Sequence, residues 1–254
     1  MTRAEEVQVV GSLTRNERKE LEPLRTAVVQ ANLDIVAAGL VLLTWGNVSA
    51  VDRSRTIVAI KPSGVAYNEL TPELIPLVDL ETGEVVDGAL NPSSDTAAHL
   101  ELYRAFESIG AVVHTHSHAA VCFAQCHKSI PCLGTTHADH FLTDIPVTRS
   151  LRTDEIQRDY ELNTGRVIVE RFMESGIDAA RTPGVLVDQH GPFAWGADTK
   201  KSVENAIVLE ACARMALDCT RLAGGEPAPA DRVLVEKHFF RKHGPGAYYG
   251  QSPT

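Results

Sequence analysis

Residues 110–126 read GAVVHTHSHAAVCFAQC, and the fold and chemistry of the chain are first visible in this stretch. The apolar residues 111–115 predict a buried strand, and a helix is predicted near residues 119–126. Side chains two apart on a strand point to the same face, so His114 and His116 converge while Thr115 points away. Neutral imidazole is a common ligand for zinc and similar ions. By itself the pair is weak evidence, because polar residues at the rim of a sheet give the same pattern.

A third histidine strengthens the prediction of a metal site. His190 lies in a turn between two strands predicted over residues 185–187 and 192–195. Three histidine ligands leave coordination positions open for a substrate or water, as a catalytic metal site requires. Asp95 is a candidate fourth group, either as a ligand or as a nearby base, although it would serve equally well as the N-cap of the helix that follows it. Residue type and spacing do not exclude the remaining histidines from metal binding, namely His99, His118, His127, His137, His140, His238 and His243.

Three short polar loops beside predicted strand ends suggest a site for an anion. They are Trp45-Gly46-Asn47, Lys61-Pro62-Ser63-Gly64 and Pro92-Ser93-Ser94. Glycine lets backbone N–H groups approach an anion, and Ser, Asn and Lys side chains donate hydrogen bonds to its oxygens. Ser93 and Ser94 also precede a predicted helix, whose N-terminus favours phosphate. Each loop alone is most simply an ordinary turn, and only the three together indicate an anion site.

The rest of the chain mixes helices and strands. Helices are predicted over residues 24–38, 95–109, 164–175, 198–222 and 231–242, and strands over residues 41–51, 56–60, 77–80 and 85–86. The order lacks a regular βαβ rhythm, so a parallel, doubly wound sheet is not expected. Residues 1–20 are charged and aperiodic, which predicts a loose extension or a fraying helix. Residues 21–254 are expected to form one catalytic domain.

Composition excludes several classes of protein. The chain of 254 residues has 24 Lys and Arg against 33 Asp and Glu, a net charge of −9, which argues against a nucleic-acid binder. No run approaches the roughly 20 apolar residues of a membrane span. The polar N-terminus does not resemble a secretory signal, so a cytoplasmic protein is expected. The five cysteines have no regular spacing, which predicts free buried thiols in a reducing compartment.

Longer blocks of sequence point to a family. The blocks LTWGNVSAVD, IKPSGV, NPSSDT, AVVHTHS, GTTHAD, HGPFAWG, NAIVLE and RKHG resemble the sugar-phosphate 4-epimerases of the class II aldolase family. The resemblance runs from about Leu24 to Gln251 in the family's order. It implies an α/β fold in which helices cover both faces of a central, largely antiparallel sheet, an α/β/α sandwich. The first 18 or so residues have no counterpart in the family, residues 223–230 differ from its corresponding loop, and so do Asp188 and Gln189.

The resemblance also implies roles for individual residues. His114, His116 and His190 match the ligands of one zinc ion per subunit, which other divalent metals could replace, and Asp95 matches the acidic residue beside it. Asp139 and Tyr249 match the catalytic acid/base pair. The positions that match substrate contacts are Gly46, Asn47, Lys61, Ser63, Gly64, Ser93, Ser94, Thr135, Glu161 and His238. The family is homotetrameric, so Tyr249 and His238 are expected to reach the site of a neighbouring subunit.

The expected activity is metal-dependent epimerisation of L-ribulose 5-phosphate at C4, by cleavage and re-formation of the C3–C4 bond. Three alternatives remain open. A class II aldolase would release both fragments. Related aldolases carry Glu at the position of Asp95, so the aspartate favours an epimerase. A hydrolase would use the metal to activate water. A non-catalytic sugar-phosphate binding protein would bind the same ligand, but it explains the three histidines and Asp139 poorly.

Overall fold

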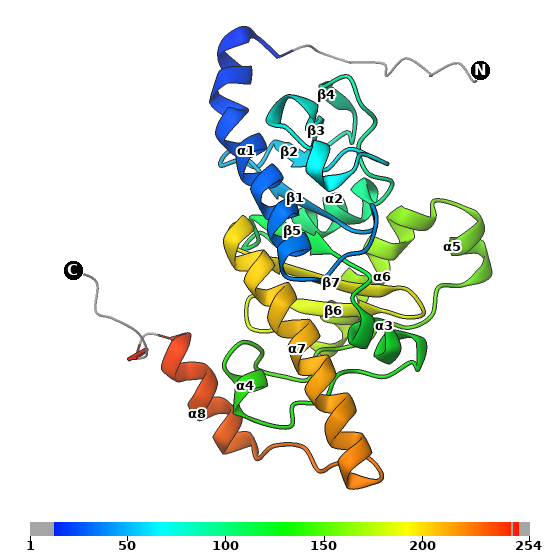
Figure 1. The fold of residues 1–254 in the computed structure, drawn as a ribbon, viewed down its shortest axis with the longest axis vertical. Coiled ribbons are helices and arrows are strands. Elements are labelled where there is room, and N and C mark those ends of the chain that lie inside the picture. The colour runs from blue at the N-terminus through cyan, green and yellow to red at the C-terminus, as the bar shows by residue number, and fades with distance from the viewer. Residues whose placement is uncertain (1–12, 245, 249–254) are drawn as a thin grey trace.

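The computed structural model describes residues 13–244 and 246–248. Its centre is a seven-stranded sheet with the strand order β4-β3-β2-β1-β5-β7-β6 (Figure 1). All pairs of neighbouring strands are antiparallel. The strands are β1 Asn47–Val51, β2 Ile57–Ile60, β3 Leu77–Asp79, β4 Val85–Asp87, β5 Ala111–His114, β6 Gly184–Val187 and β7 Gly191–Gly196. The predicted antiparallel sheet is confirmed.

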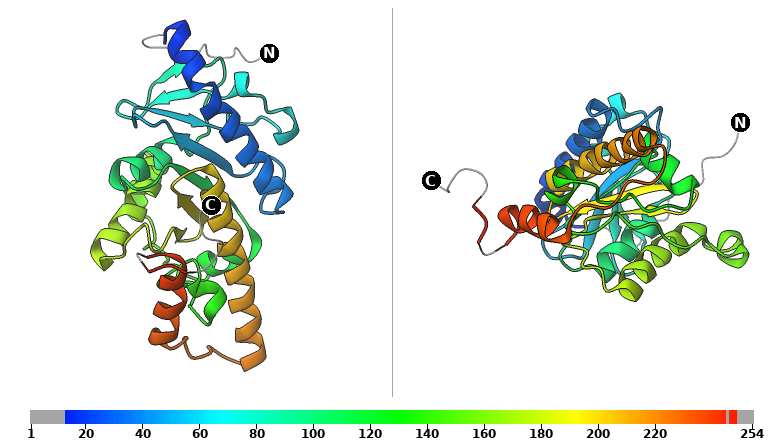
Figure 2. Two further views of the ribbon diagram at one scale, coloured as in Figure 1. Left: turned by 90° about the vertical axis from the view of Figure 1, so that its left-hand side faces the viewer. Right: turned by 90° about the horizontal axis from the view of Figure 1, so that it is seen from below.

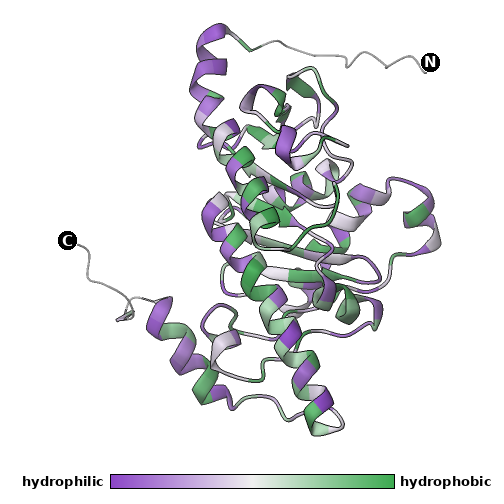
Figure 3. Cartoon of the chain, viewed as in Figure 1, coloured by the Kyte–Doolittle hydropathy of each residue, from purple (hydrophilic) through white to green (hydrophobic). Residues whose placement is uncertain are grey.

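Helices cover both faces of this sheet. One core joins alternate strand residues, such as Val113, to α1 (Arg15–Ala37), α3 (His118–Gln125) and α7 (Thr199–Ala223). A second core joins the intervening strand residues, such as Val112, to α2 (Thr96–Ala105) and α6 (Tyr160–Ser175). Figure 2 shows the two layers edge-on, and Figure 3 shows hydrophobic residues along the strands between them. This alternation is what a sheet buried on both faces requires, and it confirms the predicted α/β/α sandwich.

The remaining helices are short or lie away from the sheet. Two 3-10 turns, η1 (Tyr67–Glu69) and η2 (Pro72–Leu74), connect β2 to β3. The helices α4 (Thr135–Ala138) and α5 (Thr153–Gln157) lie between α3 and α6 in the chain. The last helix, α8 (Arg232–Lys242), packs on α4. Figure 1 shows α8 projecting beyond the sheet. The side chain of Val233, in the first turn of α8, is exposed.

Several predicted boundaries were wrong. The first helix begins at Arg15, because Thr14 and Glu17 form a capping box that closes its N-terminus. Residues 14–20 therefore belong to a capped helix or its cap, and a loose extension is excluded for them. The strand predicted from residue 41 begins only at Asn47, after a turn in which Leu43 has a φ of 53°. The second helix ends at Ala105, four residues earlier than predicted.

Two further findings concern membrane-spanning helices and the thiols. Within the described residues, no helix has the length and apolar character needed to cross a membrane. All five cysteines are unpaired, as predicted, but only Cys132 and Cys212 are buried. The expectation of five buried thiols was therefore wrong for Cys122 and Cys219, which are half-buried on α3 and α7, and for Cys126, which is exposed in the turn after α3.

Candidate metal centre and anion-binding loops

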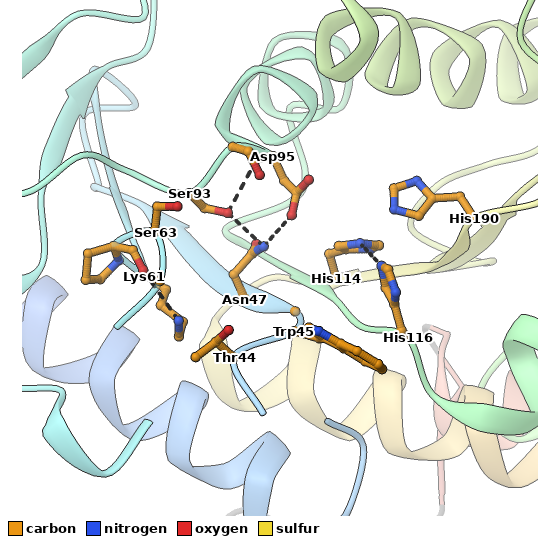
Figure 4. Close-up of a pocket in the computed structure, with 14 residues that line it drawn as sticks. Thr44, Trp45, Asn47, Lys61, Ser63, Ser93, Asp95, His114, His116 and His190 are labelled. Carbon is orange, nitrogen blue, oxygen red and sulfur yellow. Dashed lines mark hydrogen bonds between the residues drawn. The ribbon is translucent and has the colours of Figure 1, made fainter. Parts of the chain in front are cut away.

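The three predicted histidines converge in the structure. His114 is the last residue of β5, and His116 lies two residues further along the chain. His190 lies in the turn between β6 and β7. One ligand nitrogen from each ring can be chosen such that all three lie within 4.8 Å of one another. The ring centroids are 4.8 to 5.1 Å apart. Figure 4 shows the three rings pointing toward one another. The antiparallel pairing of β5 with β7 brings these distant parts of the chain together.

The His114 ring is fixed on two sides. Its Nδ1 lies 3.0 Å from the carbonyl oxygen of Pro192, which can only accept, so Nδ1 carries the proton and donates it. The Phe193 ring stacks on it with the centroids 4.2 Å apart. The unprotonated Nε2 therefore faces the cavity, 3.1 Å from Nε2 of His116. That nitrogen is the one able to bind a metal ion.

The pKa values of the three histidines favour the neutral, ligating form. Burial is the main cause of the lowered pKa in each of them. For His114 the neighbouring rings of His190 and His116 lower the pKa further. Neutral imidazoles carry the lone pair that a metal ion needs, whereas imidazolium rings do not. Three neutral nitrogen donors that converge on one point fit a divalent ion such as zinc.

Asp95 faces the cavity and does not cap its own helix. It occupies the N-cap position of α2, but its side chain makes no capping hydrogen bond. Instead Oδ2 of Asp95 accepts a hydrogen bond of 2.6 Å from Nδ2 of Asn47, and the same amide donates to Oγ of Ser93 at 3.0 Å. Among the described residues the converging ligand group consists of the three histidines alone. The role of Asp95 as a metal ligand stays a prediction.

The three polar loops meet the histidines in one cavity of about 600 Å³. Figure 4 shows Lys61, Ser63 and Ser93 at one end and the histidines at the other. At Gly46 φ is +82°, and a Cβ atom would lie 2.7 Å from the carbonyl oxygen of His114, so only glycine fits between the loop and the metal site. The residues that line the cavity are Thr44, Trp45, Gly46, Asn47, Lys61, Pro62, Ser63, Gly64, Ser93, Ser94, Asp95, His114, His116 and His190.

Lys61 is a buried cation at the loop end of this cavity. Its side chain is 2% exposed, and its Nζ lies 3.4 Å from the carbonyl oxygen of Pro62 and 4.8 Å from the centroid of the Tyr67 ring. Burial lowers its pKa. Among the described residues the contacts of Nζ are this carbonyl oxygen and this ring, both neutral, so the buried charge is poorly compensated. An anion in the cavity would supply the missing partner.

The other predicted site residues that the structure describes are not among those that line this cavity. Asp139, at the C-terminal end of α4, receives hydrogen bonds from Nδ1 of His238 at 3.1 Å and from Nη2 of Arg241 at 2.9 and 3.0 Å. Burial alone would raise the pKa of Asp139, but these hydrogen bonds and the positive charges of Lys242 and Arg241 outweigh it, and the pKa is lowered. Thr135 lines a separate hollow of about 270 Å³. Glu161 lies in the first turn of α6, and Tyr249 lies outside the described residues.

Two aromatic residues near the histidines were not predicted to have a role. The Trp45 ring lies at the cavity, 6.2 Å from the His116 ring between centroids. The phenol oxygen of Tyr160 lies 3.4 Å from Nδ1 of His190. Tyr160 precedes His190 by 30 residues and carries no motif of its own, so only the tertiary structure reveals this contact.

Known proteins resemble this chain along most of its length. Residues 26–217 match the profile of the class II aldolase and adducin N-terminal domain. The chain is 53% identical over 233 residues to L-ribulose-5-phosphate 4-epimerase UlaF of Salmonella paratyphi B, covering 91% of this chain and 100% of that protein. It is 52% identical over 231 residues to the protein of the same name from Salmonella typhi, with the same coverage.

Solved structures show the same fold. The L-fuculose-1-phosphate aldolase from Thermus thermophilus superposes with a TM-score of 0.61 at 26% identity, covering 82% of this chain and 99% of that one. The L-fuculose 1-phosphate aldolase from Glaciozyma antarctica PI12 gives a TM-score of 0.69 at 18% identity, covering 94% of this chain and 88% of that one. At such identities the likeness concerns the fold, and the chemistry has to be argued from the site.

Proposed function

The chain belongs to the class II aldolase family, and we propose that it is a metal-dependent epimerase that interconverts L-ribulose 5-phosphate and D-xylulose 5-phosphate. The observation that carries the proposal is the single cavity that has three converging neutral histidines at one end and polar loops with a buried lysine at the other. The identity of more than half to proteins named L-ribulose-5-phosphate 4-epimerase selects this substrate among small sugar phosphates.

The histidines would hold the metal, and the family expectation is zinc. His114, His116 and His190 supply three neutral nitrogen donors and leave coordination positions open, which is typical of a catalytic centre. When bound, the ion supplies Lewis-acid stabilisation for the negative charge that cleavage of the C3–C4 bond leaves on the sugar oxygens. Burial lowers the pKa of His116 and of His190. The carboxylate of Asp95 lies close enough to oppose this shift in part, and it places a negative charge beside the centre. Metal reconstitution would show whether zinc, manganese or cobalt serves best.

The loops would bind the phosphate and keep the reaction within the cavity. Lys61 provides a charge, and the hydroxyl groups of Ser63, Ser93 and Ser94 provide hydrogen bonds. Bond cleavage divides the pentulose into two pieces, one of which carries the phosphate. Holding that piece by its phosphate makes recombination intramolecular, so that it competes with escape. Rotation of the aldehyde before recombination inverts C4.

Proton transfer at the C4 oxygen is proposed for Asp139 and Tyr249, one on each face. In the structure Asp139 is held ionised by His238 and Arg241, in keeping with a base. Neither it nor Thr135, Glu161 or His238 is among the residues that line the cavity of its own chain. We therefore propose that a neighbouring subunit of a homotetramer completes each cavity with these residues.

The proposal is tested by incubating zinc-loaded protein with L-ribulose 5-phosphate and following D-xylulose 5-phosphate. Formation of the product, lost on adding a chelator and restored by zinc, is expected. If no D-xylulose 5-phosphate forms with zinc, manganese or cobalt, the proposal is refuted. Free glycolaldehyde phosphate at the full turnover rate would indicate an aldolase, inorganic phosphate a hydrolase, and binding without turnover a sugar-phosphate binding protein.

A further inference from the structure

Metal-binding histidines usually donate their second ring N–H to a fixed oxygen, which sets the tautomer and the orientation of the ring. His114 has such a partner in the carbonyl oxygen of Pro192. The ring of His190 lies in a turn, and its polar partner among the described residues is a tyrosine hydroxyl group. The orientation of His190 therefore depends on a side chain, whereas that of His114 depends on the backbone.

We propose that Tyr160 is a positioning residue that holds His190 as an Nε2 ligand, an inference that rests on the metal site of the proposed function. The phenol oxygen lies 3.4 Å from Nδ1 of His190. The two ring centroids are 6.1 Å apart and the planes are inclined by 35°, so the hydroxyl group makes the contact and the rings do not stack. When Nδ1–H donates to this oxygen, the lone pair resides on Nε2, which is the arrangement already fixed for His114 by the backbone.

The fold holds Tyr160 in place independently of the metal. Tyr160 is the first residue of α6, and the hydroxyl group of Thr164 donates to its carbonyl oxygen at 2.9 Å. The helix packs along α2, the helix that begins beside Asp95 (Figure 1). Tyr160 thus joins α6 to His190, which lies in the turn between β6 and β7.

The test compares zinc affinity in the full chain and in Tyr160→Phe, which keeps the ring and removes only the oxygen. Loss of an outer partner of a ligating histidine typically weakens metal binding by about 10- to 100-fold, and this loss is expected. The absorption bands of the cobalt-substituted protein should shift as well, because the geometry at His190 changes. The matched control is Tyr103→Phe, which removes a buried hydroxyl group that lies 2.8 Å from Oγ of Ser49. It should lower thermal stability and leave zinc affinity unchanged.

Equal zinc affinity and equal cobalt spectra for wild type and Tyr160→Phe would overturn the inference while leaving the epimerase proposal intact. Wild-type protein that takes up no zinc would overturn both. If Tyr160→Phe does not fold, a second measurement on the wild-type protein tests the inference. A long-range ¹H–¹⁵N spectrum of the zinc-loaded wild type should show His190 protonated at Nδ1 and ligated through Nε2, and the opposite pattern would refute the role of Tyr160.

Discussion

At the scale of single residues, the buried Lys61 is the clearest sign of what the cavity binds. A lysine that is 2% exposed and lies between a carbonyl oxygen and a tyrosine ring is poorly compensated until an anion arrives. We expect Lys61→Met to raise the KM for the sugar phosphate by about 30-fold, the equivalent of a charged hydrogen bond worth about 2 kcal/mol. Thermal stability should be equal or higher, because methionine fills the space without a charge.

Steady-state kinetics and zinc affinity of Lys61→Met would be measured together. Zinc affinity should not change, because Lys61 lies at the opposite end of the cavity from the histidines (Figure 4). A lower kcat with an unchanged KM would contradict a phosphate-binding role. Lys200→Met is a suitable control, since that lysine is exposed on α7 and lines no part of the cavity.

The pKa of Asp139 is also controlled by individual side chains. Burial by itself raises its pKa, and the hydrogen bonds from Arg241 and His238 reverse that effect. A carboxyl group with a lowered pKa stabilises the fold above its unfolded-state pKa, and this contribution is lost as the pH falls through the folded pKa. Arg241→Gln should therefore raise the pKa of Asp139 and move the acid loss of stability to higher pH.

A carboxyl ¹³C NMR titration of Asp139 and thermal melts from acid to neutral pH would follow the effect of Arg241→Gln. Arg232→Gln is the control on the same helix, because the Arg232 side chain is mostly exposed and pairs with Glu236. An unchanged titration of Asp139 in Arg241→Gln would show that the arginine does not hold the carboxylate. If the fall in activity at acid pH shifts together with the midpoint of the NMR titration, the ionised form of Asp139 is required for turnover.

At the scale of elements, α2 packs closely on α6, the helix that begins with Tyr160. Gly165 of α6 lies so close to α2 that a Cβ atom would come within 2.9 Å of the Cα atom of Ala98. Overpacking of this kind costs about 1–3 kcal/mol, and the better helix propensity of alanine offsets about 1 kcal/mol of it. Gly165→Ala should therefore lower the Tm by a few degrees. Thermal melts would be compared with those of Gly225→Ala, at which a Cβ atom meets nothing within 4 Å.

The elements also show how far sequence patterns reach. Long periodic helices such as α7 and the strands beside the histidines were predicted correctly, because periodicity and turn residues are local signals. The four-residue helix α4 and the five-residue helix α5 were missed, since they are too short to show a period. The contact of Tyr160 with His190 joins residues 30 positions apart, and that of Asp139 with His238 joins residues 99 apart. Such contacts depend on packing that no local pattern contains.

At the scale of the whole molecule, the predicted site divides into two parts. One part is the cavity with the histidines and the three polar loops. The other is the cluster of Asp139, His238 and Arg241, where α8 packs on α4 at the far end from β4 (Figure 1). If the active site uses both, two chains have to meet, with the cavity of one facing the cluster of the other. Symmetric oligomers repeat such a contact at every interface.

Two inactive chains should then rescue each other. His114→Asn removes a metal ligand and spares the Asp139 cluster, whereas Asp139→Asn spares the cavity. Each variant alone should be inactive, but co-expressed in equal amounts they form mixed oligomers in which about a quarter of the sites combine an intact cavity with an intact cluster. Activity near one quarter of the wild-type value is therefore expected, measured as D-xylulose 5-phosphate formed per chain. If both parts of the site belonged to one chain, no mixture could contain an intact site, and the co-expressed protein would stay as inactive as its components.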